Sequence, residues 1–238
     1  MSAPGAAGRP PRAQPIAQLA RDGSPTMPKP SSYEFVYLAS QSPRRRQLLD
    51  QLGASHHLLL ADPGEDTEAL EAHLAGEAPD AYCARVTGLK LQAALERLAR
   101  RGLDPAPVLC ADTTVALGSR IFGKPADAAD ASATLQRLSG RTHRVLTAVA
   151  VARPGARGRF EVDARLNVST VRFAPLPPAV IAHYVASGEP FGKAGSYAIQ
   201  SRIAGWIERI AGSYSGIMGL PLHETAQLLI AADVRLDA

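Results

Sequence analysis

One run of sequence, Phe35-Val-Tyr-Leu-Ala-Ser-Gln-Ser-Pro-Arg-Arg-Arg-Gln-Leu-Leu-Asp-Gln-Leu-Gly53, predicts a strand, a polar turn and a helix in immediate succession. Ser42 can cap the helix, and Pro43 suits its first position because the missing N–H is not needed there. Gly53 suits the C-terminal end. The apolar positions fall on one helical face: Leu48, Leu49 and Leu52. A strand that leads directly into an amphipathic helix is typical of α/β proteins.

The first turn of this predicted helix carries three consecutive cations, Arg44, Arg45 and Arg46. Because the N-terminal end of a helix is electropositive, arginines are disfavoured there unless an anion offsets them. Backbone amides, guanidinium groups and the hydroxyls of Ser40 and Ser42 could together bind a phosphate. A solvated basic turn is the alternative interpretation.

From Tyr33 onward, short β-branched and apolar runs alternate with helical stripes. We expect strands at 35–39, 58–61, 108–111, 145–151, 160–173 and 205–210. Turns at 118–119 and 154–159 favour antiparallel pairing, so the predicted fold class is α/β, with a mixed central sheet and flanking helices. Two buried helical stripes are expected, one at Tyr82, Val86, Leu89 and Ala93 and one at Val180, Ile181, Tyr184 and Val185.

Residues 1–32 differ in composition from the rest of the chain, with seven prolines and few large apolar side chains. Burial there cannot offset the entropy lost on ordering, so we expect a disordered Pro/Ala/Arg-rich extension and one folded domain over 33–238. A targeting peptide is the alternative, although the prolines interrupt any amphipathic helix and no continuous apolar core is present in this segment.

The net charge of +4 lies mostly in the extension, which carries +3 and leaves the rest of the chain nearly neutral. We therefore expect no nucleic-acid partner. We also expect no membrane partner, because no apolar run approaches the roughly 20 residues needed to span a bilayer. Cys83 and Cys110 lack CxxC spacing and are predicted to be buried free thiols, which together with the missing targeting signal predicts a cytoplasmic protein.

Asp112 interrupts the apolar run from Val108 to Leu117. Because a buried carboxylate without a partner is costly, this one should be paired, bound to a metal, or placed at a strand end that faces a cleft. The ends of strands are where α/β proteins place ligands, so Asp112 and Thr113 are candidate site residues. An Asx turn that merely ends the strand is the alternative.

Three lysines and one glutamine are weaker candidates. Lys124 and Lys193 lie in turn-rich Phe-Gly-Lys segments, and Lys90 lies on the predicted helix. The glycine-rich run 192–200 permits close approach of a ligand to the backbone, and the amide of Gln200 offers a donor and an acceptor to a nucleobase. Each of these residues would also fit an ordinary surface position.

The pattern of metal-binding residue types favours a hard cation. The sequence shows no zinc-type histidine spacing and no Gly-x-Ser-x-Gly elbow. Magnesium binds through one or two carboxylates together with substrate phosphates, and Asp112 with Glu65 or Asp66 would suit it.

Several separated motifs, taken in order, resemble the Maf family of nucleotide pyrophosphatases over 36–229. They are Leu38-Ala-Ser-Gln-Ser-Pro-Arg-Arg-Arg-Gln-Leu-Leu, Ala111-Asp-Thr-Thr-Val, Gly123-Lys-Pro, Leu138-Ser-Gly-Arg-Thr-His, Tyr184-Val-Ala-Ser-Gly-Glu-Pro, Gly192-Lys-Ala-Gly-Ser-Tyr-Ala-Ile-Gln, and Gly212-Ser-Tyr through Gly219-Leu-Pro.

The resemblance implies two lobes around an active-site cleft, and hydrolysis between the α- and β-phosphates of a nucleotide that depends on a divalent cation, Mg or Mn. By position, Asp112 corresponds to the proton acceptor and to one metal ligand. Glu65 is the match for a second ligand, although the stretch 62–67 departs from the family's usual acidic run. The substrate-binding positions are Ser40, Arg44, Arg45, Lys90, Thr113, Lys124, Lys193 and Gln200, of which Arg44, Thr113 and Gln200 are tied to substrate choice.

The Asp-Thr pair and the Ile-Gln loop are similar to the branch of the family that acts on dTTP and UTP. We therefore expect a nucleoside triphosphate pyrophosphatase that converts these substrates to the monophosphate and pyrophosphate. Two alternatives are a pyrophosphatase for 7-methyl-GTP or other non-standard purine nucleotides, and a nucleotide-binding regulator without turnover. The sequence leaves open whether the protein forms a homodimer.

Overall fold

The computed structural model describes residues 33–66 and 68–237, so the expected extension over 1–32 lies outside the described residues. The strands are β1 (Val36–Leu38), β2 (His56–Leu58), β3 (Val108–Leu117), β4 (Arg120–Phe122), β5 (Thr142–Pro154), β6 (Phe160–Phe173) and β7 (Ile207–Ala211). The α-helices are α1 (Pro43–Gln51), α2 (Pro79–Arg100), α3 (Ala128–Leu138), α4 (Pro178–Ala186), α5 (Tyr214–Met218) and α6 (Leu222–Ala231). Short 3₁₀ turns are η1 (Ala69–Glu71), η2 (Ala156–Gly158), η3 (Ala194–Ser196) and η4 (Arg202–Trp206).

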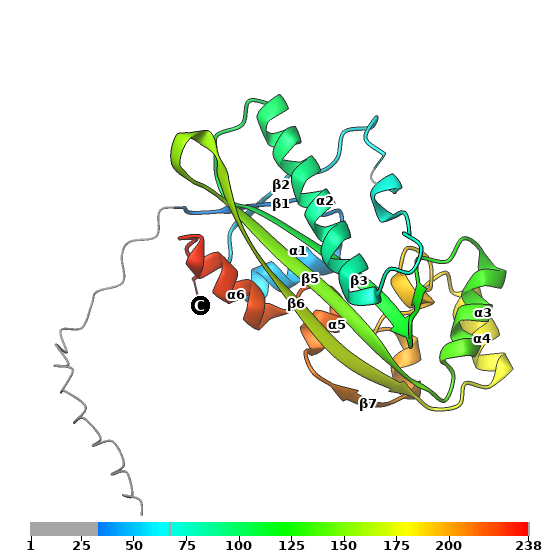
Figure 1. Ribbon diagram of the computed structural model, residues 1–238. Coiled ribbons are helices and arrows are strands. Elements are labelled where there is room, and N and C mark those ends of the chain that lie inside the picture. The colour runs from blue at the N-terminus through cyan, green and yellow to red at the C-terminus, as the bar shows by residue number, and fades with distance from the viewer. Residues whose placement is uncertain (1–32, 67, 238) are drawn as a thin grey trace, which may run out of the picture. The chain divides into compact units, whose positions relative to one another are not determined.

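The strands form one mixed sheet in the order β2-β1-β3-β5-β6-β7, with β4 paired to β3 as a hairpin (Figure 1). β1 runs parallel to β2 and β3, whereas the β3–β5, β5–β6 and β6–β7 pairs are antiparallel. The predicted α/β class with a mixed central sheet and flanking helices is therefore confirmed.

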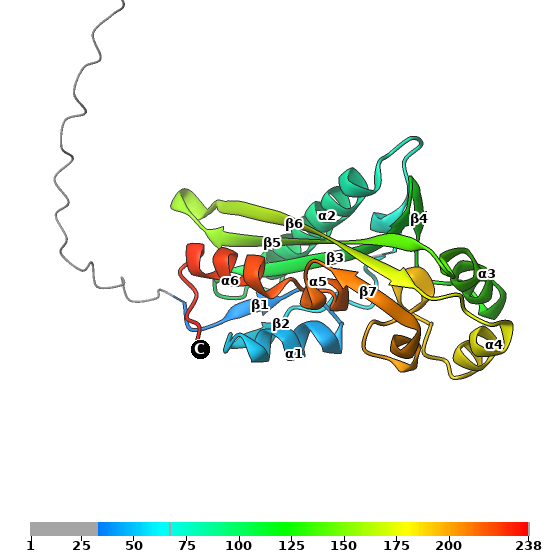
Figure 2. The same cartoon turned by 90° about the horizontal axis from the view of Figure 1, so that it is seen from below.

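Helices cover both faces of this sheet (Figure 2). α2 packs on one face through Leu91, Ala94 and Leu98, which share a core cluster with Val108 of β3. α1 and α6 pack on the other face, where Leu48 and Leu49 join the apolar residues of α6 and β5. A third cluster lies between α3, α4 and the far ends of β5 and β6.

Most local predictions match the elements, with some corrections. α1 begins at Pro43 as predicted, and Gly53 takes a left-handed backbone with φ of 62° just beyond its end. Ser42 occupies the predicted N-cap position with an extended backbone, but its side chain makes no capping hydrogen bond. Its backbone N–H donates to Ser40 Oγ at 3.2 Å. On α2, Leu89 and Ala93 are only half-buried, since the helix face turned to the sheet passes through Cys83, Thr87 and Leu91.

Cys83 and Cys110 are buried free thiols, as predicted, and burial raises the pKa of each to about 11. Across residues 33–66 and 68–237, no helix is both long and apolar enough to cross a membrane.

Candidate active site

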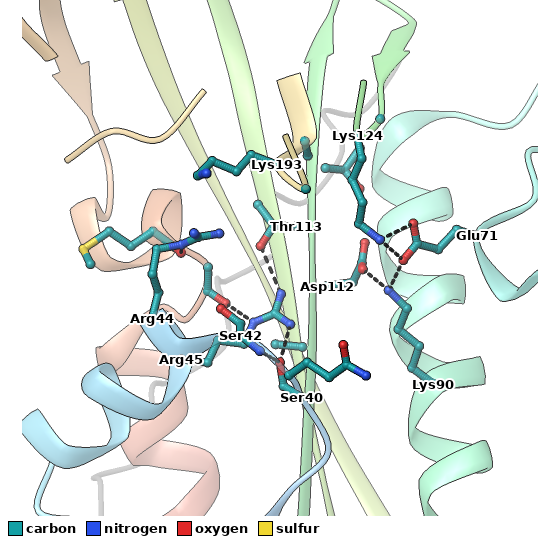
Figure 3. Close-up of a pocket in the computed structure, with 18 of the residues that line it drawn as sticks. Ser40, Ser42, Arg44, Arg45, Glu71, Lys90, Asp112, Thr113, Lys124 and Lys193 are labelled. Carbon is teal, nitrogen blue, oxygen red and sulfur yellow. Dashed lines mark hydrogen bonds and ion pairs between the residues drawn. The ribbon is translucent and has the colours of Figure 1, made fainter. Parts of the chain in front are cut away.

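A cavity of about 540 Å³ lies where the β1–α1 turn, β3, α2 and the loop before η3 meet (Figure 3). Side chains from segments far apart in the sequence line it. They include Ser40, Arg44, Arg45, Lys90, Asp112, Thr113, Lys124 and Lys193, eight of the residues that the sequence singled out.

The cavity sits at a gap in the sheet. β1 pairs with β3 only at Val108 and Leu109, and β4 joins the same edge of β3 from Val115 onward. Between these contacts, residues 110–114 of β3 pair with β5 alone. Because successive strand side chains point to opposite faces, Asp112 and Thr113 reach the cavity from the two sides of this gap.

Arg45 holds one side of the cavity together. Its Nε donates to the carbonyl oxygen of Gly219 at 2.8 Å, one terminal nitrogen donates to Ser40 Oγ at 3.1 Å, and the other donates to Thr113 Oγ1 at 3.4 Å. Thr113 Oγ1 also lies 3.0 Å from Thr147 Oγ1 of β5. The guanidinium group thus fixes the β1–α1 turn against β3 and the segment after α5.

Arg44 and Lys193 place two further cations on this side. Arg44 Nε donates to the carbonyl oxygen of Met218 at 3.3 Å, and Lys193 Nζ donates to the carbonyl oxygen of Glu189. Burial, followed by repulsion from neighbouring arginine charge, lowers the pKa of both groups. A bound anion would relieve this repulsion, so the pair is a candidate phosphate site.

On the opposite side of the cavity, carboxylates and ammonium groups form a row in which the charges alternate. Lys90 Nζ lies 2.5 Å from Asp112 Oδ1 and 2.6 Å from Glu71 Oε1, and Lys124 Nζ lies 3.0 Å from the same Glu71 oxygen (Figure 3). Burial opposes the charge of Lys90, but attraction to Asp112 and Glu71 outweighs it and raises the pKa of Lys90. The carboxylates therefore retain Lys90 as a cation.

Glu65 is not among the residues that line the cavity with Asp112. Glu65 accepts from Arg97 Nε at 3.0 Å and from Arg100 at 2.5 Å, and the hydrogen bonds from Arg97 hold the pKa of its carboxyl below the usual range. Arg97 is itself almost fully buried and donates to the carbonyl oxygen of Leu59. Glu65 thus neutralises an arginine cluster that supports the cavity wall.

Gln200 is also outside the cavity lining. Its side chain is exposed, whereas the preceding residue, Ile199, is buried and lines the cavity. Asp66, the other acidic alternative, caps η1 by accepting from the backbone N–H groups of Glu68 and Ala69.

The residue that the sequence reasoning missed is Glu71. It is one of six acidic residues between positions 62 and 77, and nothing in their spacing distinguishes the one that faces the cleft. A weak signal existed, because Glu71 ends η1 just before the helix that carries Lys90. Tyr82 of α2 fixes this turn by donating to the carbonyl oxygen of Glu71 at 2.9 Å.

The arrangement suits a polyanionic substrate and a hard cation. Six cationic side chains line the cavity, and one of them, Arg97, is paired with Glu65. The other five, at Arg44, Arg45, Lys90, Lys124 and Lys193, stand against the two carboxylates of Asp112 and Glu71. This excess of positive charge attracts phosphates. Among the described residues there is no cluster of three or more His, Cys, Asp and Glu side chains, so a metal here would depend on the two carboxylates together with ligand oxygens.

The chain is similar to known proteins over most of its length. Residues 35–232 match the family model described as "Maf-like protein". A dTTP/UTP pyrophosphatase of Polaromonas sp. is 63% identical over 203 residues, covering 85% of this chain and 98% of the relative. One of Burkholderia pseudomallei is 64% identical over 203 residues, covering 85% and 96%. Among solved structures, a HAM1 protein from Coxiella burnetii is 16% identical with a TM-score of 0.42, covering 82% of this chain and 98% of that chain.

Proposed function

The chain belongs to the Maf-like protein family, and from that premise we propose that it hydrolyses dTTP and UTP to the monophosphate and pyrophosphate. The observation that carries the proposal is a cavity in which Asp112 and Glu71 face five cationic side chains, in a protein more than 60% identical to dTTP/UTP pyrophosphatases. A nucleoside triphosphate supplies the negative charge that this cavity lacks.

In the proposed reaction, water attacks the α-phosphorus and the bond to the bridging oxygen of the β-phosphate breaks. Asp112 orients the water and accepts its proton. The pyrophosphate that leaves carries increasing negative charge, which Arg44, Arg45 and the lysines offset. Lys90 holds the Asp112 carboxylate in place at 2.5 Å and keeps it directed into the cavity.

Asp112 and Glu71 are the two residues that would hold a divalent cation in this cavity. Both carboxylates already face one cation, the Lys90 ammonium, at 2.5 and 2.6 Å, and two carboxylates with substrate oxygens form the donor set that magnesium prefers. When bound there, the cation would add positive charge beside the phosphate oxygens. We propose Glu71 for this role in place of Glu65, whose oxygens accept from Arg97 and Arg100.

For selection of the base we propose Thr113 and Gln200. Thr113 lies in the cavity wall beside Arg45, and Gln200 directly follows the cavity residue Ile199. An amide that donates and accepts is complementary to the edge of uracil or thymine.

The test is to incubate the purified full-length protein with dTTP, UTP, CTP, dATP, GTP and 7-methyl-GTP, in Mg²⁺, in Mn²⁺ and with a chelator, and to separate the products. We expect pyrophosphate and the monophosphate from dTTP and UTP, with release stopped by the chelator. Release of orthophosphate, or an equal rate for all six nucleotides, would overturn the proposal.

A further inference from the structure

The longest strand of the sheet leaves most of one edge open. β6 runs antiparallel to β5 along its full length, but β7 pairs only with its last residues, Thr170 to Phe173 (Figure 1). Within residues 33–66 and 68–237, no strand pairs with 160–168 on the side away from β5.

The backbone of this open edge can form hydrogen bonds. The Phe173 N–H donates to the carbonyl oxygen of Arg141, which is on the β5 side, and the β5–β6 register runs without a bulge. Because backbone groups alternate sides along a strand, the even-numbered residues from 160 to 168 direct their N–H and C=O groups to the open side. One of these carbonyls, that of Ala164, accepts from the side chain of its neighbour Arg165.

The open edge carries charged side chains on one face, at Glu161, Asp163 and Arg165, and apolar side chains on the other. Segment 160–168 contains no proline, lysine or bulge, and its even-numbered side chains include three exposed apolar ones, Val162 at 55%, Leu166 at 38% and Val168 at 44%. Natural edge strands normally avoid such a surface because another strand can pair with it.

The sequence of this edge is complementary to itself in the antiparallel sense. If Ala164 pairs with Ala164 of a second copy, Val162 lies opposite Leu166 on one face. On the other face Asp163 lies opposite Arg165, and twofold symmetry produces this charge pair twice. Among the described ion pairs, neither Asp163 nor Arg165 takes part in any. If the centre of the pairing moves by one residue, from Ala164 to Arg165 or to Asp163, that charged residue lies opposite its own copy, and like charges face each other.

We propose that β6 joins β6 of a second copy of this chain, edge to edge and centred on Ala164, so that two sheets become one continuous sheet. Main-chain hydrogen bonds supply much of the affinity in such strand additions, and the facing side chains fix the register. This inference is independent of the proposed enzymatic activity.

Charge exchange tests the register. We expect wild-type full-length protein to sediment as a dimer in analytical ultracentrifugation. Asp163→Arg and Arg165→Asp, each alone, create like-charge pairs and should raise the dimer dissociation constant at least about tenfold. The double variant exchanges the two charges and should restore the dimer, and an equimolar mixture of the two single variants should form a heterodimer. A monomeric wild type, or single variants that remain fully dimeric, would overturn the proposal.

Crosslinking tests the twofold centre. Opposed hydrogen-bonded residues of an antiparallel pair have Cα atoms about 5.5 Å apart, within disulfide range. Ala164→Cys should form an interchain disulfide with copper–phenanthroline as oxidant, whereas the matched control Val162→Cys, which faces Leu166, should crosslink far less. The natural cysteines are buried and give little background. Equal crosslinking of both variants would contradict the register.

Discussion

The ammonium nitrogen of Lys90 lies 2.5 Å from a carboxylate oxygen of Asp112, and the same nitrogen lies 2.6 Å from Glu71. One lysine of α2 therefore orders two acidic groups that come from β3 and from the turn before α2. The two carboxylates proposed to accept a proton and to bind a metal therefore meet at Lys90, and each can be changed separately by mutation.

Asp112→Asn should abolish most turnover while preserving nucleotide binding. The amide keeps the shape of the side chain but cannot accept a proton, and loss of a positioned general base typically lowers kcat by about 10²–10⁴-fold. Pyrophosphate release and calorimetric binding of a non-hydrolysable dTTP analogue measure the two properties. Asp104→Asn, on an exposed loop, is the matched control and should behave as wild type. Undiminished turnover in Asp112→Asn would exclude Asp112 as the base.

Glu71→Gln should weaken the dependence of the protein on its divalent cation. Removal of one of two carboxylates should raise the Mg²⁺ concentration for half-maximal activity by at least about tenfold. Direct Mn²⁺ binding, followed by calorimetry, gives a readout that does not depend on turnover. Glu68→Gln, three residues earlier and exposed, serves as the control. Equal Mn²⁺ affinity in the two variants would remove Glu71 from the metal site.

Glu65→Gln should affect stability more than chemistry. The change leaves the guanidinium of Arg97, which is 3% exposed, without its anionic partner. We expect a loss of about 1–2 kcal/mol in the free energy of unfolding, or several degrees in Tm, measured by urea and thermal denaturation. The kcat at saturating Mg²⁺ should stay within about twofold of wild type. A large rise in the Mg²⁺ requirement would restore Glu65 as a metal ligand.

Gln200→Ala should relax base selection before it impairs hydrolysis. Loss of an amide that contacts the base should lower kcat/KM for dTTP and UTP more than for GTP, since the phosphates bind the cationic side chains of the cavity and not Gln200. The ratio of kcat/KM values across the nucleotide panel is the measurement. If that ratio is the same as in wild type, base selection must rest on Thr113 or on the apolar lining.

The buried imidazole of His143 should make the fold less stable in mild acid. Its Nε2 lies 2.7 Å from the Tyr197 hydroxyl, and burial lowers the pKa of His143 to about 4. In the unfolded chain the imidazole has its ordinary pKa of 6.5, so between these values the unfolded state binds more protons and stability falls as pH falls. We expect the free energy of unfolding at pH 5 to be about 2 kcal/mol lower than at pH 7.5 from this group. Urea denaturation of wild type and His143→Gln checks this, and an equal pH dependence in both would contradict it.

Local patterns predict much of the fold. Phe160 and Phe173 bound β6 as expected, and α1 starts at its proline because proline is favoured at a first helical turn. The second strand is expected at 58–61, whereas β2 spans His56–Leu58, because its parallel register with β1 determines where pairing ends.

The site was only partly accessible to sequence reasoning. The arginines and Asp112 could be found because a cation at a helix start and a carboxylate in an apolar strand each conflict with their surroundings. Glu71 lies in an acidic, polar stretch of sequence, so its charge does not distinguish it from its neighbours. Only the packing of η1 against α2, through the Tyr82 hydrogen bond, directs it to Lys90.

The three contacts of Arg45 also bear on when the site is formed during folding. Its guanidinium contacts Ser40, Thr113 and the carbonyl of Gly219, and the last of these lies 174 residues from Arg45 in the chain. Contacts of such long sequence separation form late, after the local elements have docked. A growing chain at the ribosome would therefore contain every cation and carboxylate of the cavity well before they are held in their final arrangement, so nucleotide binding should appear only with the last steps of folding.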